Sequence, residues 1–315
     1  MKKPYNLLVI LGATAGGKTG LAVKVAAHLD GEIISADSRQ VYRGMDLGTG
    51  KDLVEYGDIP YHLIDIADPG SEYNVFQFQR DCFDSIETIW QQQRLPIICG
   101  GTGMYLDAVL SGYRLVAVPR NQQLRDELEL FSDSSLRQKL LELKPEQHNR
   151  TNLEQRERLI RAIEIAVGEQ VQTQANPGMG DEDIPLDLPP LPDISPLIFG
   201  IKWPREVLRK RIAVRLQQRF EAGMIDEVQQ LYDAGVAWEK LEFYGLEYRL
   251  IAQYLQGKLN RNDMVQKLRS AIGQFAKRQE TFFRRMEKRG VEICWLDGEG
   301  DVFGELCQKL KDRSF

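Results

Sequence analysis

The clearest chemical signal in the sequence is a glycine-rich loop near residue 12. The segment Gly12-Ala13-Thr14-Ala15-Gly16-Gly17-Lys18-Thr19 satisfies the pattern GxxxxGK[ST], and it lies between an apolar run and a helical pattern. Such a loop curls so that its backbone N–H groups point at phosphate oxygens, and the following helix adds its positive end. Lys18 supplies a charge to the outer phosphate, and the Thr19 hydroxyl is suited to ligate Mg²⁺. The pattern predicts a bound di- or triphosphate, without deciding whether ATP binds.

Two further polar segments follow apolar runs. Ser35-Ala36-Asp37-Ser38-Arg39-Gln40 ends the second run, and Gly100-Gly101-Thr102-Gly103 ends the third. The carboxyl ends of parallel strands open onto one site, so Asp37 is placed for general base work. Asp is equally typical of a helix N-cap, and both interpretations stay open. The glycines around Thr102 suit either a close approach to a ligand or a tight strand–helix turn.

The apolar pattern of the sequence predicts the strands and helices that carry these residues. Continuous β-branched stretches, typical of strands buried on both faces, occur at Leu7–Leu11, Glu32–Ala36, Leu95–Cys99, Leu197–Ile201 and Val291–Trp295. Helical patterns at Gly20–Leu29 and Phe76–Gln92 alternate with them. This alternation predicts an α/β fold: a three-layer P-loop core with a parallel sheet.

About a hundred residues separate the third and fourth strands, far more than a crossover needs. We expect helices at Asn121–Phe131 and Ser134–Leu143, then a third helix opened by the capping box Thr151–Glu154 and stopped near Gly168. The Pro- and Gly-rich stretch 170–195 predicts a mobile loop. The expected domains are therefore a core at 1–118, a helical insertion at 119–195, and core completion with basic C-terminal helices at 196–315.

Charge is unevenly distributed along the chain. The net charge is −5, yet Lys202–Arg219 holds seven basic and one acidic residues, and Lys267–Arg289 holds eight basic and two acidic. Within the first stretch, Leu208, Ile212, Leu216 and Phe220 mark the core face of a helix, and Arg211, Arg215 and Arg219 line an adjacent stripe. Two such stretches can bind a polyanion although the whole chain is acidic, whereas the alternative is a salt-bridged solvated face.

Composition argues against several other classes of protein. The four cysteines form no CxxC pair and only three histidines are present, so neither a zinc site nor a disulfide scaffold is expected. The longest plain apolar run, Leu7–Leu11, is too short for a transmembrane helix. We expect a cytoplasmic protein without membrane contact, and a monomer by default.

The ordered motifs resemble those of the tRNA dimethylallyltransferase (tRNA isopentenyltransferase) family. The resemblance rests on GATAGGKT, on the segments Ile33–Lys51, Tyr61–Pro69 and Pro96–Leu106, and on the R-x-x-R-A-x-E pattern at Arg158–Glu164. It continues through Arg205, Arg211 and Arg215 to Lys277-Arg278-Gln279 and Phe283-Arg284, so it spans nearly the whole chain.

This resemblance implies an activity, a cofactor and a set of contacts. It implies Mg²⁺-dependent transfer of a dimethylallyl group from its diphosphate to N6 of the adenosine 3′ of the anticodon, in tRNAs that read codons beginning with U. Lys18, Thr19 and Arg215 would hold the diphosphate, and Asp37 would take the proton. The implied contacts with the anticodon stem-loop are Asp37, Ser38, Arg39, Gln40, Thr102, Arg125, Glu157, Arg158, Leu159, Ile160 and Arg161.

Three alternatives share parts of this pattern. A small-molecule kinase would use the loop for ATP and Asp37 as a base toward a hydroxyl. An adenylate isopentenyltransferase would prenylate free nucleotides. A non-catalytic RNA-binding protein would keep the loop for structure alone. The basic stretches favour a nucleic-acid acceptor, and the complete set of Lys18, Thr19 and Asp37 favours catalysis.

Overall fold

The fold is built around one parallel sheet of six strands. The computed structural model describes residues 5–113, 118–145, 156–175 and 191–313. The strand order is β3-β2-β4-β1-β5-β6, with every pairing parallel. Their bounds are β1 Leu7–Gly12, β2 Gly31–Ala36, β3 Tyr61–His62, β4 Leu95–Gly100, β5 Pro196–Lys202 and β6 Cys294–Asp297. Both β1 and β2 are buried along their whole length, as continuous apolar strands require.

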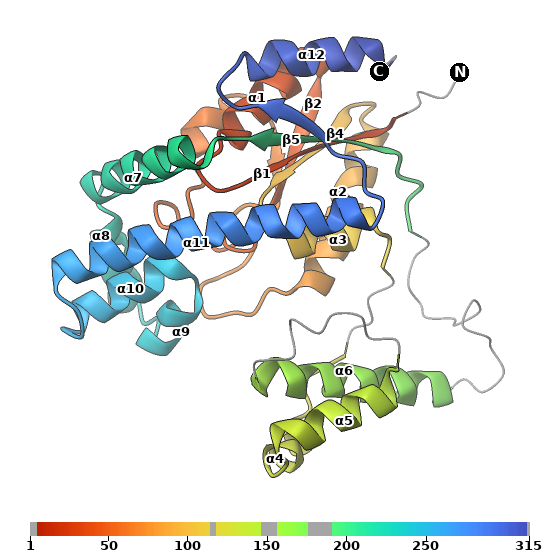
Figure 1. The fold of residues 1–315 in the computed structure, drawn as a ribbon, viewed down its shortest axis with the longest axis vertical. Helices are drawn as coiled ribbons and strands as arrows, with labels where there is room; N and C mark the ends of the chain where they lie inside the picture. Colours follow the sequence, from red (N-terminus) through yellow and green to blue (C-terminus); the bar gives the residue numbers. More distant parts are fainter. Residues whose placement is uncertain (1–4, 114–117, 146–155, 176–190, 314–315) are drawn as a thin grey trace. The chain divides into compact units, whose positions relative to one another are not determined.

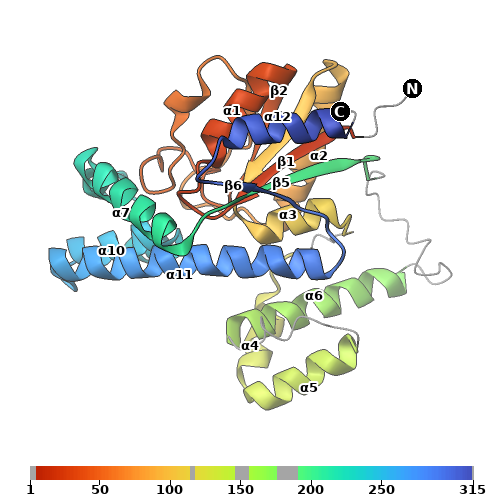
Figure 2. The same ribbon diagram turned by 45° about the horizontal axis from the view of Figure 1, so that its top comes forward.

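Helices cover both faces of the sheet (Figures 1 and 2). Helices α1 (Lys18–Leu29) and α12 (Val302–Asp312) pack on one face, where they meet Leu8 and Ile10 of β1. Helices α2 (Val75–Gln91), α3 (Gly103–Leu110) and the end of α11 (Arg261–Lys288) cover the other, against Leu7 and Val9. The predicted three-layer α/β P-loop core is thus confirmed.

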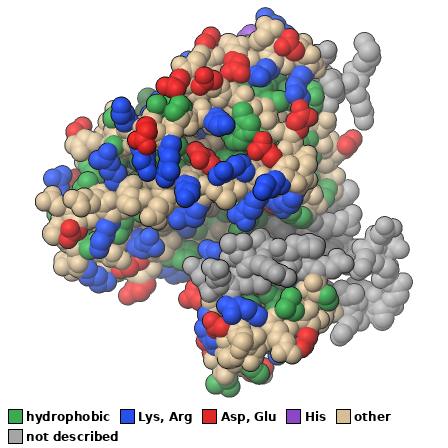
Figure 3. All heavy atoms as spheres, viewed as in Figure 1, with side chains coloured by type: hydrophobic (Ala, Val, Ile, Leu, Met, Phe, Trp, Pro, Cys, Tyr) green, Lys and Arg blue, Asp and Glu red, His purple; other side chains and the backbone are tan. Residues whose placement is uncertain are grey.

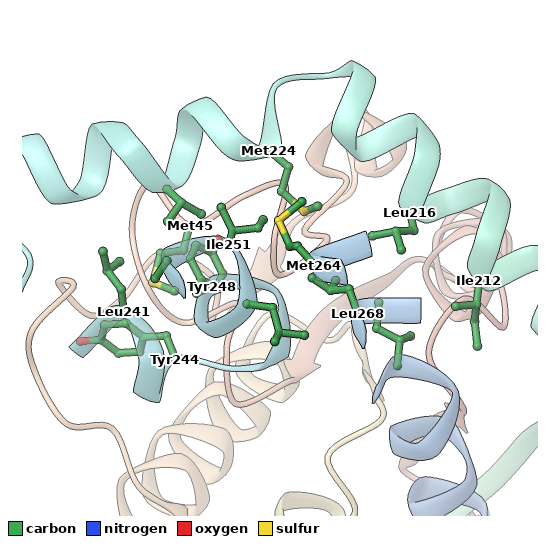
Figure 4. Close-up of a cluster of buried hydrophobic side chains, with 14 of the residues drawn as sticks. Met45, Ile212, Leu216, Met224, Leu241, Tyr244, Tyr248, Ile251, Met264 and Leu268 are labelled. Atoms are coloured by element: carbon green, nitrogen blue, oxygen red, sulfur yellow. The ribbon is translucent and has the colours of Figure 1, made fainter. Parts of the chain in front are cut away.

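A second apolar core joins the C-terminal helices to the loop after β2 (Figure 4). It is formed by α7 (Arg205–Glu221), α8 (Met224–Asp233), α9 (Trp238–Phe243), α10 (Leu246–Leu255) and the first half of α11. Met45 from the loop lies among these helices, near Tyr244 and Tyr248. The predicted core face of α7 is correct for Leu208, Ile212 and Leu216, whereas Phe220 is only partly buried. This core fixes α7 beside the carboxyl end of the sheet.

The inserted segment forms a compact unit of its own. Residues 114–190 make up this unit, and 1–113 with 191–315 make up the other, whereas the sequence places these borders after 118 and 195. Its helices are α4 (Gln122–Glu129), α5 (Asp133–Leu143) and α6 (Arg156–Ala175). They share a core of Leu128, Leu136, Leu140, Leu159, Ile160, Ile163 and Ala166.

Several sequence-based expectations need correction. Helix α6 does not stop at Gly168, because this glycine lies inside the helix, where a Cβ would stand 2.6 Å from Val118 Cγ1. The helix also includes the first six residues of the expected mobile loop, and 176–190 lie outside the described residues, as does the capping box at Thr151–Glu154. The last strand starts at Cys294 rather than Val291, and β3 was not predicted because two residues form no pattern.

No helix within the described ranges is both long and apolar enough to span a membrane.

Candidate active site

The loop between β1 and α1 has the backbone shape of an anion-binding nest. Ala15 has φ 60° and Gly17 has φ 81°, both left-handed, and α1 begins directly after Gly17. Left-handed residues within such a turn aim backbone N–H groups toward one point. Ala15 has a Cβ, so its conformation costs about 1–2 kcal/mol, a cost typical of ligand-binding loops. The loop is therefore shaped to receive phosphate oxygens.

Side chains from the C-terminal half hold this loop from behind. The Trp203 indole N–H donates to Gly16 O at 3.0 Å, and Arg211 Nε donates to Ala15 O at 2.9 Å. The Arg211 guanidinium also stacks on the Trp203 ring, 4.2 Å from its centroid. Both contacts engage carbonyl oxygens of the loop. Through these carbonyls they hold the backbone of the loop in place.

Gln279 of α11 ties two predicted site segments together. Its Oε1 accepts the Thr14 N–H at 2.8 Å, and its Nε2 donates to Gly101 O at 2.9 Å. The side chain is buried, so both bonds are shielded from water. The Thr14 N–H, predicted to face phosphate, is thus already engaged within the protein.

Lys18 starts α1 within reach of the loop's own backbone. Its Nζ donates to Ala13 O at 2.8 Å. Burial lowers the pKa of Lys18 to about 8; Cys99 and Asp37 act to raise it, whereas the nearby Arg215 lowers it further. A buried cation gains from an incoming anion, so Lys18 is poised for a phosphate. Thr19 follows on the first turn of the helix and is partly exposed.

Asp37 directly follows β2, at the start of a turn. Its Oδ1 accepts the Arg39 N–H at 2.9 Å, and no helix follows within this part of the chain, so the N-cap interpretation is wrong. The next residue, Ser38, donates its N–H to Thr102 Oγ1 at 3.1 Å. The ends of β2 and β4 are thereby joined, with Asp37 close enough to Lys18 for their charges to interact.

Gln40 is engaged within the protein rather than presented to a ligand. It accepts from the Ser35 hydroxyl at 2.8 Å and donates to Gly50 O at 2.9 Å. Arg39 lies over the exposed Phe243 ring, 5.5 Å from the centroid. Of these two predicted RNA contacts, Arg39 is partly exposed, whereas Gln40 is buried and connects β2 to the loop around Gly50.

The loop that reaches Gly50 is anchored by two charged side chains, Glu227 and the buried Lys51. Glu227 of α8 accepts the N–H groups of Asp46, Leu47 and Gly48 at 2.9, 2.6 and 3.0 Å. Lys51 is fully buried, and its Nζ donates to Tyr42 O at 2.7 Å and to the carboxylates of Asp46 and Asp65. The backbone on both sides of Gly50 is therefore fixed.

Three arginines on one face of α7 point toward these loops. Arg211 binds the phosphate loop, as described above. Arg215 forms an ion pair with Asp52 at 2.8 Å, and Arg219 lies 3.8 Å from the same carboxylate oxygen. The predicted stripe thus borders the site, and Arg215 lies near Lys18.

The predicted RNA contacts of the insertion divide into two groups. Glu157 and Arg158 are exposed on α6. The side chains of Leu159 and Ile160 are buried in the insertion's core, so the expectation that they contact RNA is wrong for these side chains.

Arg125 and Arg161 of the insertion converge on the buried Glu164, at 2.8 and 2.5 Å. Burial would raise the pKa of Glu164, but hydrogen bonds from both arginines and from the Asn121 N–H outweigh it and lower the pKa to about 2. Each arginine therefore already has a carboxylate partner.

Sequence reasoning missed several residues that shape the site. Trp203, Glu227 and Asp52 were given no role, and Gln279 was noted only as part of a motif. A signal existed for Trp203, which directly follows a strand beside β1. The others act through contacts between segments far apart in the chain, which spacing does not reveal.

The chain matches known families and proteins over nearly its whole length. A family model described as IPP transferase matches residues 40–286, and one described as isopentenyl transferase matches residues 5–56. A protein of Syntrophotalea carbinolica named tRNA dimethylallyltransferase 2 is 60% identical over 296 residues, 94% of this chain and 95% of that one. The tRNA dimethylallyltransferase 1 of Geotalea uraniireducens is 59% identical over 307 residues, 97% of each.

Solved structures show the same fold. The full-length tRNA isopentenylpyrophosphate transferase of Bacillus halodurans superposes with a TM-score of 0.67 at 32% identity, covering 98% of both chains. A eukaryotic dimethylallyltransferase acting on tRNA gives a TM-score of 0.75 at 24% identity, covering 93% of this chain and 73% of that one.

Proposed function

Because the chain belongs to the IPP transferase family, we propose that it transfers a dimethylallyl group from dimethylallyl diphosphate to an adenosine of tRNA. The main support for this proposal is that the phosphate loop, Asp37 and Thr102 meet at the carboxyl ends of β1, β2 and β4, with Arg215 beside them. Loop and cations suit a diphosphate, and a carboxylate beside them suits a proton-bearing acceptor.

The reaction exchanges one carbon–oxygen bond for one carbon–nitrogen bond. The N6 amine of adenosine attacks the allylic carbon, the bond from that carbon to diphosphate breaks, and the amine loses a proton. Negative charge grows on the leaving diphosphate, where the loop's N–H groups, Lys18 and Arg215 stabilise it. Asp37 takes the proton from N6, because it is the carboxylate that directly follows β2 at the carboxyl end of the sheet.

The family's chemistry implies a divalent cation, and we propose that it is Mg²⁺. No three His, Cys, Asp or Glu side chains in the described segments gather to form a metal cage. Mg²⁺ favours few protein ligands, together with phosphate oxygens and waters, so the Thr19 hydroxyl at the loop fits it. When bound, the ion would neutralise charge on the diphosphate.

We propose the anticodon stem-loop as the acceptor, at the adenosine 3′ of the anticodon in tRNAs that read codons beginning with U. The target base must leave its stack to reach Asp37. Basic side chains support a polyanionic partner: Lys and Arg gather along α11 on the face shown in Figure 3. Such a substrate also places the protein in the cytoplasm.

The acceptor decides between this proposal and its alternatives. Dimethylallyl diphosphate carrying a label on its allyl group is incubated with the protein and tRNA, AMP, or no acceptor. We expect label in tRNA alone. Label in AMP would indicate an adenylate isopentenyltransferase. Transfer of phosphate from labelled ATP to a small hydroxyl acceptor, without prenyl transfer, would indicate a kinase.

A further inference from the structure

Arg219 holds a buried nitrogen without a hydrogen-bond partner. Its Nη2 is the one such buried side-chain atom found across the described parts of the chain, and the side chain is only 12% exposed. Burying a guanidinium N–H without an acceptor is costly, so an unsatisfied group of this kind calls for an explanation.

The nearest carboxylate is shared with another arginine. Asp52 Oδ2 lies 2.8 Å from Arg215 Nη2 and 3.8 Å from Arg219 Nη2. Both guanidinium groups pack against Gly50, where a Cβ would overlap the two Nη2 atoms. One carboxylate thus faces two cations, and only Arg215 is within hydrogen-bond distance of it.

The surroundings of Arg219 disfavour its charged form on balance. Burial and the neighbouring Arg215 lower the pKa of Arg219 to about 10, and Asp52 and Glu247 only partly offset them. No ion pair joins Arg219 to Glu247 in the described structure, and burial raises the pKa of Glu247, which makes it a weaker partner. Asp52 is therefore the carboxylate best placed to become a partner of Arg219, but it is hydrogen-bonded to Arg215.

We propose that Arg219 is a positioning residue that accepts Asp52 from Arg215 when a diphosphate binds. This inference rests on the proposed function, in which Arg215 holds the leaving diphosphate. An arriving diphosphate competes with Asp52 for Arg215, and a carboxylate left there would repel it. Moving Asp52 by about 1 Å brings it within hydrogen-bond distance of Arg219 Nη2. Neither arginine is then left without an anion.

A double-mutant cycle separates this exchange from direct binding. The probe is inorganic diphosphate, titrated calorimetrically into the full-length protein. Arg219→Met keeps an unbranched apolar stem and removes the guanidinium that receives Asp52, so we expect affinity to fall about tenfold. Asp52→Asn removes the competing charge, so it should bind at least as tightly as the unmodified protein. In the Asp52→Asn background, Arg219→Met should have no further effect.

Controls keep each outcome decisive. Arg209→Met removes an exposed cation of α7 that pairs with Glu206, and it should leave the affinity unchanged. An equal loss from Arg219→Met in both backgrounds would overturn the exchange and indicate direct contact with the diphosphate. No loss in either, or weaker binding by Asp52→Asn, would overturn it as well. A wild-type protein that binds no diphosphate would instead contradict the proposed function.

Discussion

Asp37 lies in a turn where its carboxylate already accepts one N–H, so its second oxygen is the atom proposed to take the proton. Asp37→Asn keeps an acceptor for the Arg39 N–H and removes the base. We expect a fall in single-turnover rate of at least about a hundredfold, with unchanged melting temperature and tRNA affinity. The exposed Asp58, changed to Asn in the same way, serves as control. A rate within a few fold of the parent would place the base elsewhere.

Lys18 should take up a proton when a diphosphate binds. The pKa of Lys18 is lowered to about 8 from an ordinary 10.5, so between these values the folded protein binds fewer protons than the unfolded chain. This term makes stability rise with pH across that window. A diphosphate raises the pKa again, so binding near pH 8.5 should take up a proton.

Calorimetry in two buffers of different ionisation enthalpy measures this uptake. Lys18→Met should abolish the part of the uptake that belongs to the protein and weaken binding of diphosphate. Because the proton balance of the ligand itself is common to both titrations, the difference between the two proteins is decisive. Equal uptake by both would show that Lys18 is already fully protonated in the free protein.

Elements far apart in the sequence hold the phosphate loop in shape, and α11 does so through one residue. Gln279→Met leaves the Thr14 N–H and Gly101 O without partners, a loss of about 1–3 kcal/mol for each buried group. We expect faster amide hydrogen exchange in residues 12–17 and a higher KM for dimethylallyl diphosphate. The exposed Gln274→Met on the same helix should change neither. Unchanged exchange in the loop would contradict this role of α11.

Helix α6 offers a test of packing inside the insertion. Gly168→Ala would place a Cβ 2.6 Å from Val118 Cγ1, so we expect a loss of about 1–3 kcal/mol in unfolding free energy. Val118→Ala should relieve the overlap, so the double variant should recover part of the loss. A neutral Gly168→Ala, measured by thermal unfolding, would show that the helix accommodates the methyl group.

The glycines of the phosphate loop and Gly168 show which features of an element the sequence predicts and which it does not. The phosphate loop was predictable because its chemistry requires a local pattern between a strand and a helix. Gly168 resembles a helix stop in the sequence, because glycine is common there. Its actual role, close packing against Val118, could not be predicted, because Val118 is fifty residues away in the chain. Arg219 and Gln279 were likewise visible only as members of a stripe and a motif, because their contacts join distant segments.

The whole molecule is acidic, yet its basic side chains are concentrated in α7 and α11. If these helices neutralise phosphates of tRNA, affinity should fall steeply with salt. The logarithm of the association constant should drop by about 0.7–0.9 per phosphate neutralised for each decade of salt. Arg158 is exposed on α6 of the insertion, outside these two helices. Arg158→Ala should weaken tRNA binding and leave diphosphate affinity unchanged. An association constant independent of salt would contradict this electrostatic account.

The proposed reaction places the dimethylallyl group on one adenosine of tRNA. The most direct measurement incubates unmodified tRNA with the protein and dimethylallyl diphosphate, digests it, and locates the added group by mass spectrometry of the fragments. We expect N6-dimethylallyladenosine at a single position, immediately 3′ of the anticodon, and no product with Asp37→Asn. Unmodified tRNA, or modification at another position, would contradict it.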